Sequence, residues 1–175
     1  MNYIFLDVDG VLNNKKYLLA HKDDDGTIDP ENIELLAKLA HEFNCHIILS
    51  SSWKNGFKEN LEPKYKTIQL FDKTEIPSRC QRLLNSFKEY NLKLEGLTPN
   101  VVTPQDIAWS RPFEIQKYIR TNLKENDNFV ILDDDDDICN SMLKMFPNHF
   151  IQTNFETGFN LEHYDKAVKI LNKEA

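Results

Sequence analysis

Short apolar runs alternate along this chain with stretches in which apolar residues recur every three or four positions. The runs predict buried strands at about residues 3–8, 46–49, 129–132 and 149–152. The periodic stretches predict helices after Asp29, over about 78–91, after Arg111, and over about 138–145 and 161–172. This alternation is typical of an α/β domain with a mainly parallel sheet.

The helix after Asp29 has clear local signals. Asp29 is expected to cap its first turn, and Pro30 suits the first helical position. Apolar residues then share one face at i, i+3, i+4 and i+7: Leu36, Leu39, Ala40 and Phe43. The later helices are expected to present similar stripes, formed by Leu83, Leu84 and Phe87, by Ile115, Tyr118, Ile119 and Leu123, and by Leu161, Tyr164, Val168 and Leu171.

Two segments carry weaker patterns. Residues 13–28 are polar and are expected to form a loop or small hairpin, with a solvated acidic tip at Asp23–Asp25. Residues 53–110 hold one good helix among several prolines, and their inner part could form a small lobe over the sheet. Because neither a repeat nor a linker is evident, the 175-residue chain is expected to form one domain.

Composition narrows the classes of function. The chain has 21 Lys+Arg against 28 Asp+Glu and a net charge of −7, which disfavours a large nucleic-acid footprint but allows a local basic patch. Cys45, Cys80 and Cys139 form no C-x-x-C pair, and the 5 histidines form no spaced cluster, so reduced, mostly buried thiols are expected.

No apolar run reaches the length of about 18 residues that indicates a membrane-spanning helix. The start of the chain does not resemble a signal peptide, so a soluble, cytoplasmic protein is expected.

Acidic residues directly follow two of the predicted strands. Asp7 and Asp9 come after the first apolar run, and Asp133 and Asp134 come after the run at 129–132. Ligands of α/β folds bind at the carboxyl ends of strands, so these acids are expected to converge if the two strands are parallel and close. Crowded carboxylates repel one another unless a cation is bound, and an all-oxygen ligand set favours Mg²⁺. A metal beside a free carboxylate suits phosphoryl chemistry.

Two more candidates lie at element boundaries. Ser50 follows the strand at 46–49, where its hydroxyl can bind a phosphate oxygen, and Ser51 takes this role if the strand ends one residue later. Arg111 precedes a helix, where its charge can pair with a phosphate or with a carboxylate.

The order Asp7-x-Asp9-Gly10, Ser50, Arg111 and Asp133-Asp134 resembles the haloacid dehalogenase (HAD) superfamily. The strings Leu49–Lys54 and Ile151–Phe159 are similar to a small branch, some members of which occur with RNA-repair proteins. The resemblance implies a Rossmann-like three-layer α/β sandwich with a central parallel sheet and at most a small cap. It implies one hydrolase domain over 1–175, with 13–28 as a flap and 55–109 as a small lobe.

The resemblance also implies a phosphatase mechanism. Asp7 attacks phosphorus and forms an aspartyl-phosphate. Asp9 protonates the leaving oxygen and then activates water, while Ser50 and Arg111 hold the phosphoryl group. ATPase members carry threonine in place of Asp9, and the dehalogenase branch generally lacks this second acid, so a phosphatase is favoured.

The implied cofactor is Mg²⁺. Its ligands are Asp7, the backbone carbonyl of Asp9, and an aspartate of the pair Asp133 and Asp134, with the choice within the pair left open. Asp135 and Asp136 are expected to be solvated.

An open site favours a macromolecular substrate, and a phosphotyrosine protein is the first expectation. A polynucleotide phosphate end and a non-catalytic module that binds a phosphorylated partner are the alternatives.

The glycines form no phosphate-binding G-x-x-x-x-G-K-[ST] loop, which argues against a P-loop NTPase, and the part after Asp134 is too short for a receiver domain. Trp53 is expected in the core, with Lys54 and Lys58 on the surface.

Overall fold

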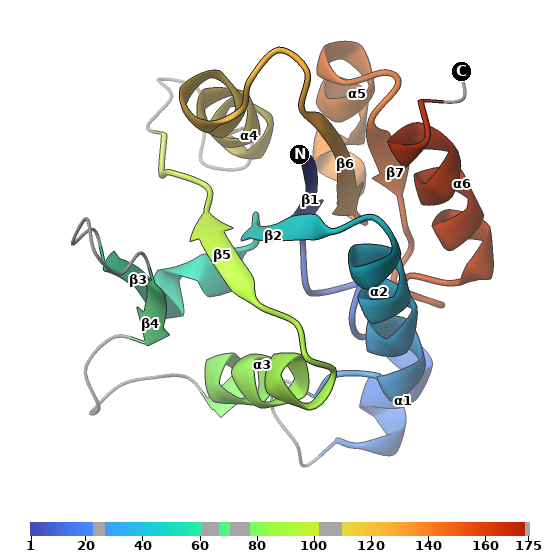
Figure 1. Cartoon of the computed structure of the whole chain (residues 1–175). Coiled ribbons are helices and arrows are strands. Elements are labelled where there is room, and N and C mark those ends of the chain that lie inside the picture. Colours follow the sequence, from blue (N-terminus) through green and yellow to red (C-terminus); the bar gives the residue numbers. More distant parts are fainter. Residues whose placement is uncertain (23–26, 61–66, 71–77, 102–109, 174–175) are drawn as a thin grey trace.

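A parallel sheet forms the centre of the molecule (Figure 1). The computed structural model describes residues 1–22, 27–60, 67–70, 78–101 and 110–173. Its main sheet has five strands in the order β5-β2-β1-β6-β7. Their bounds are β1 Asn2–Leu6, β2 Cys45–Leu49, β5 Leu94–Leu97, β6 Asn128–Asp133 and β7 Phe150–Gln152. All four strand pairs are parallel, which confirms the α/β architecture expected from the sequence.

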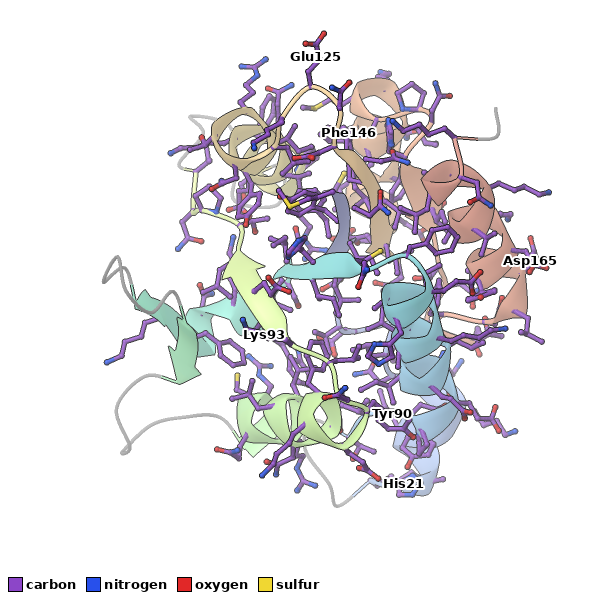
Figure 2. The ribbon with its side chains drawn as sticks, viewed as in Figure 1. His21, Tyr90, Lys93, Glu125, Phe146 and Asp165 are labelled. Atoms are coloured by element: carbon purple, nitrogen blue, oxygen red, sulfur yellow. The ribbon has the colours of Figure 1, made fainter. Side chains whose placement is uncertain are left out.

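Helices cover both faces of this sheet (Figure 1). One layer contains α2 (Pro30–Glu42), α3 (Ser78–Glu89) and α6 (Leu161–Leu171), and the other contains α4 (Ser110–Asn122) and α5 (Asp136–Met145). In β1, Ile4 and Leu6 pack in the first layer and Phe5 in the second, because successive side chains of a strand point to opposite faces. In Figure 2, Phe146 lies inside beside α5, whereas Glu125 and Asp165 point away from the molecule.

Local sequence signals account for the starts of α2 and α6. The Asp29 side chain accepts a hydrogen bond from the Glu31 backbone N–H at 3.0 Å and caps α2, with Pro30 at its start. The inward stripes are largely confirmed, but Leu161 is 64% exposed. This residue opens α6, directly after the Asn160 cap, so it precedes the part of the helix that packs on the sheet.

The segment 13–28 contains a helix, so the expected loop or hairpin is wrong. Helix α1 spans Lys15–Ala20, and the Asn14 side chain caps it by accepting from the Tyr17 N–H at 2.9 Å. The polar composition concealed a short run of good helix formers after an asparagine cap. The expected acidic tip at Asp23–Asp25 lies outside the described residues.

The segment 53–110 adds elements that periodicity did not reveal. A 3₁₀ turn, η1 (Ser52–Gly56), leads into an antiparallel pair, β3 (Phe57–Asn60) and β4 (Thr67–Leu70). Strand β5 then joins the main sheet beside β2. This strand was missed because Glu95 and Gly96 interrupt its apolar run. At Gly96 a Cβ would lie 2.6 Å from the Tyr118 hydroxyl oxygen.

Candidate active site

The carboxyl ends of three neighbouring strands meet at one edge of the sheet. In β1, Leu6 pairs with Leu49 of β2 on one side and with Leu132 of β6 on the other. The Asp7 N–H donates to the Leu132 carbonyl at 3.0 Å, and the Ser50 N–H donates to the Leu6 carbonyl at 2.8 Å. The predicted convergence of the two acidic strand ends is therefore observed.

Three carboxylates form a compact cluster at this edge. Asp7, Asp133 and Asp134 each offer an oxygen, and these oxygens lie within 4.8 Å of one another. Burial raises the pKa of Asp7, while Arg111 and Ser51 oppose this effect. Burial and then the charge of Asp7 raise the pKa of Asp133 to about 7 and that of Asp134 to about 6. Crowded, desolvated oxygen donors fit a hard divalent cation, which would be held by these three side chains.

Arg111 links the nucleophile candidate to the second acidic strand end. It is the second residue of α4, and one guanidinium nitrogen, Nη1, donates to Asp7 Oδ2 at 3.0 Å and to Asp133 Oδ2 at 2.7 Å. Burial disfavours the charge on Arg111, but Asp133 and Asp7 outweigh it and hold its pKa above the ordinary value. The guanidinium thus lies where it can also bind the oxygens of a phosphoryl group.

The two candidate hydroxyls have different surroundings. The Ser51 hydroxyl hydrogen-bonds to the Asp7 carboxylate, which lowers the pKa of Asp7, and it caps η1 by accepting from the Trp53 N–H at 3.4 Å. The Ser50 hydroxyl is buried and has no hydrogen-bond partner within the described part of the chain. Of the pair, Ser51 therefore has the direct contact with the nucleophile candidate.

The side chain of Asp9 is exposed and does not belong to the carboxylate cluster, although its charge acts on Asp7 and Asp134. Its Oδ1 accepts from the Asn13 side-chain amide and its Oδ2 from the Trp53 indole, both at 2.9 Å. The resemblance implies a metal contact only through the backbone carbonyl of Asp9, and neither side-chain hydrogen bond uses that atom. Asn13 was not predicted from the sequence, where its only signal is a polar residue directly after the apolar Val11 and Leu12.

Gly10 brings the two acidic segments together. Its φ of +64° lies in the left-handed region, and a Cβ there would lie 1.9 Å from Asp134 Oδ2. The Gly10 carbonyl also accepts from the Thr153 hydroxyl at 2.8 Å. Only glycine allows the turn after Asp9 to pack this closely against Asp134.

A polar pocket of about 290 Å³ lies beside the cluster and is lined by Ser51 and Arg111, which both contact Asp7. The Lys54 ammonium and Glu114 Oε2 are 2.5 Å apart in its wall, and each side chain is 9% exposed. The expectation that Lys54 lies on the surface is thus wrong, because η1 turns it inward toward α4.

The other expectations around this edge have mixed outcomes. Lys58 is exposed and Trp53 is buried, as expected, although the Trp53 indole also reaches Asp9. Asp135 is half-buried and lines the pocket, so the expectation that it is merely solvated is wrong. Asp136 is exposed, in agreement with the prediction.

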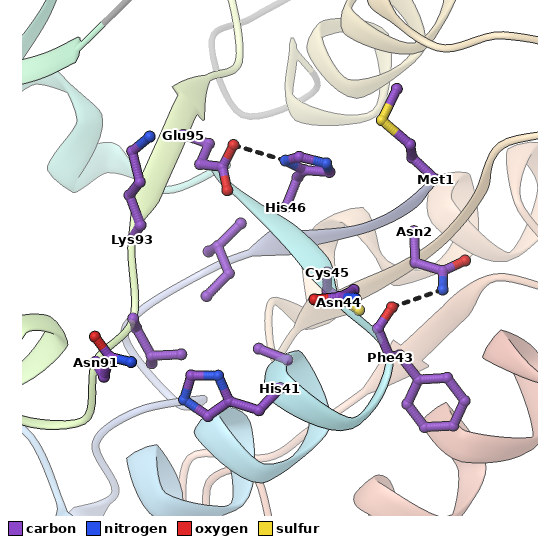
Figure 3. A pocket seen from close by; sticks show the side chains of 13 residues that line it. Met1, Asn2, His41, Phe43, Asn44, Cys45, His46, Asn91, Lys93 and Glu95 are labelled. Carbon is purple, nitrogen blue, oxygen red and sulfur yellow. Dashed lines mark hydrogen bonds and ion pairs between the residues drawn. The ribbon is translucent and has the colours of Figure 1, made fainter.

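A larger pocket of about 530 Å³ lies at the opposite, amino end of the strands (Figure 3). Its lining includes His41, His46, Lys93 and Glu95, and His46 Nδ1 lies 2.6 Å from Glu95 Oε2. None of the candidate site residues lines it. Within the described residues, the only group of three or more acids, histidines or cysteines able to hold a metal is the cluster at the carboxyl end.

The three cysteines are reduced thiols, but only Cys80 is buried, so the expectation of mostly buried thiols is wrong for Cys45 and Cys139, which are half-buried. Cys80 is fully buried, and burial raises the pKa of the Cys45 thiol to about 12. None of the helices in the described ranges has the length and apolar character needed to cross a membrane.

The parallel sheet and its acidic carboxyl edge define a hydrolase domain of the HAD type. The family model for the HAD domain in Swiss Army Knife RNA repair proteins matches residues 3–164, and the chain belongs to this family. No curated protein and no solved structure matches the chain. The resemblance to the RNA-repair branch is confirmed. Membership supports a phosphatase or another hydrolase in general, and the carboxylate cluster is consistent with the Mg²⁺ that HAD domains typically use.

Proposed function

We propose that this protein is a Mg²⁺-dependent phosphatase that hydrolyses a phosphomonoester at the end of a nucleic acid. One observation gives the main support for this class of reaction. The Arg111 guanidinium bridges Asp7 and Asp133 at 3.0 and 2.7 Å, directly beside a three-carboxylate cluster. A nucleophile, a cation for the phosphoryl oxygens and a set of hard ligands therefore share one edge of the sheet.

Each residue of the site has its own role in the proposed reaction. An Asp7 oxygen attacks phosphorus as the bond to the leaving oxygen breaks, and Arg111 and Ser51 hold the phosphoryl oxygens. Asp9 gives its proton to the leaving oxygen and later accepts a proton from the water that cleaves the Asp7 ester. Mg²⁺, when bound, neutralises phosphate charge so that the carboxylate can approach phosphorus.

The family description supports a nucleic-acid substrate, since the match is to a domain of RNA-repair proteins. The net charge of −7 argues against a long contact with the phosphate backbone, so recognition is expected to be confined to the terminal phosphate and its nearest nucleotide. The phosphotyrosine substrate expected from the sequence has no such support and becomes a comparison arm of the experiment.

A substrate panel tests the proposal. We expect phosphate release from 3′- or 5′-phosphorylated oligonucleotides with kcat/KM at least about tenfold above that of a phosphotyrosine peptide, measured at equal ionic strength. Chelation should stop turnover and added Mg²⁺ should restore it. Turnover that survives chelation would overturn the metal requirement, and a preference for the peptide would overturn the substrate class. The absence of release from every ester would overturn the phosphatase itself.

A further inference from the structure

Neutral nitrogen donors hold the Asp9 carboxylate at both of its oxygens. Asn13 donates to Oδ1 and the Trp53 indole N–H to Oδ2, each at 2.9 Å. Because each oxygen has its own donor, rotation of the carboxylate would break both hydrogen bonds. Asp9 is exposed, so these two contacts, rather than packing around its own side chain, set its orientation.

Both donors belong to the buried part of the molecule. Asn13 is 1% exposed, and its side-chain oxygen accepts from the Gly10 N–H at 3.0 Å. Trp53 is 2% exposed and packs in the larger core cluster, and its carbonyl accepts from the Cys80 thiol at 3.6 Å. A buried indole N–H needs an acceptor, and here that acceptor is an exposed acid at the site.

One short turn reaches both catalytic candidates. The Ser51 hydroxyl caps η1 and contacts Asp7, while Trp53 within the same turn contacts Asp9. The end of β1 presents these two aspartates two residues apart. The turn therefore fixes the second carboxylate relative to the first.

We propose that Trp53 and Asn13 are positioning residues that aim the Asp9 carboxyl at the leaving-group oxygen. The proposal rests on the proposed function and adds how its proton carrier is oriented. As the Asp7–phosphorus bond forms and the leaving-group bond breaks, the Asp9 proton passes to the departing oxygen. Water then bonds to phosphorus, its proton passes to Asp9, and the Asp7–phosphorus bond breaks. Each Asp9 oxygen keeps a second acceptor position for these transfers.

Two substrates can test this positioning role, because their leaving groups differ in how much they need a proton. Trp53→Phe removes the N–H donor and keeps an aromatic ring. A 4-nitrophenolate departs readily without a proton, whereas an alkoxide does not, and a positioned general acid contributes about 10²–10⁴-fold. We expect kcat/KM for glycerol 2-phosphate to fall about 30-fold and kcat/KM for 4-nitrophenyl phosphate to change less than about threefold. Rapid mixing should show a burst of 4-nitrophenolate, because the water step, which also uses Asp9, becomes slow.

Two further variants separate positioning from stability. Asn13→Ala removes the other donor and should show the same selective loss of activity. It tests the role even if Trp53→Phe folds poorly. Phe87→Leu reduces volume in the same core cluster and should leave the ratio of the two kcat/KM values unchanged. An equal loss for both esters, or no loss, in both donor variants would overturn the positioning role while the proposed function stands. A wild-type protein inactive on both esters and on the phosphorylated oligonucleotides would overturn the proposed function and this inference together.

Discussion

The two ends of the main sheet carry pockets that differ in size and in the charged groups beside them. At the carboxyl end, a pocket of about 290 Å³ lies beside three clustered carboxylates and one arginine. At the amino end, a pocket of about 530 Å³ is lined by histidines, a lysine and a single acid, as Figure 3 shows. The larger pocket lacks a crowded group of like charges, so size does not identify the site.

The burial of the charged side chains beside the smaller pocket is what indicates a functional site there. The side chains of Asp7 and Asp133 are 6% and 1% exposed, whereas those of His46 and Glu95 are 33% and 31% exposed. Two like charges out of water raise each other's pKa and oppose folding, so such crowding is typical of functional sites. A partly exposed contact between a histidine and a carboxylate costs little and is common on surfaces.

The largest effect is expected from Asp7→Asn. Loss of the nucleophile should lower kcat for an aryl phosphate at least about 10³-fold. The melting temperature without metal should not fall, because the substitution removes a buried charge that repels Asp133. Steady-state kinetics and thermal denaturation measure the two outcomes. Persistent activity would remove Asp7 as nucleophile.

Arg111→Met should come next. Removing the cation from the phosphoryl site should lower kcat/KM about 10²–10³-fold. It also leaves Asp7 and Asp133 without their shared partner, so the melting temperature in the absence of metal should fall. A variant with unchanged kcat/KM would exclude Arg111 from the site. Arg111→Lys, which keeps the charge, should recover part of the activity.

The Lys54–Glu114 pair tests whether the pocket wall is structural. Lys54→Met should lower the free energy of unfolding by about 3 kcal/mol, since it leaves Glu114 buried without its partner. The double variant Lys54→Met with Glu114→Leu should cost less than the sum of the single variants. Urea denaturation of the full cycle gives the coupling energy, and strict additivity would argue against the pair.

Metal binding can be measured without turnover. A concentration of Mg²⁺ about 100 times Kd should stabilise the wild type by about 2.7 kcal/mol. Asp134→Asn removes one carboxylate of the cluster and should reduce this gain. Thermal shift against Mg²⁺ concentration is the measurement. Equal shifts in both proteins would place the ion elsewhere.

The smallest effect is expected at the amino end. Glu95→Gln removes one charge of a partly exposed pair and should change the free energy of unfolding by less than about 1 kcal/mol. Its kcat/KM should equal that of the wild type. A large loss of activity would show that the two ends of the sheet are coupled and would break the contrast between them.

Sequence periodicity predicted the helices and strands whose buried faces are formed by residues close together in the chain. The α2 stripe and the apolar β1 and β6 runs depend on residues near in the chain, and Asp29 caps α2 through its neighbours. The same signals failed for α1, a helix of only six residues in a polar segment, and for β5, in which Glu95 and Gly96 interrupt the apolar run.

The sequence by itself determined the chemistry available at the strand ends: acids after β1 and β6, hydroxyls after β2 and a cation before α4. Tertiary structure decided which of these groups meet. Arg111 joins Asp7 across 104 positions, and Trp53 reaches Asp9 across 44. Such contacts follow from strand order and from the direction of one 3₁₀ turn, neither of which leaves a periodic pattern in the chain. For that reason the sequence predicted the candidate nucleophile and its acidic neighbours but not the two donors that contact Asp9.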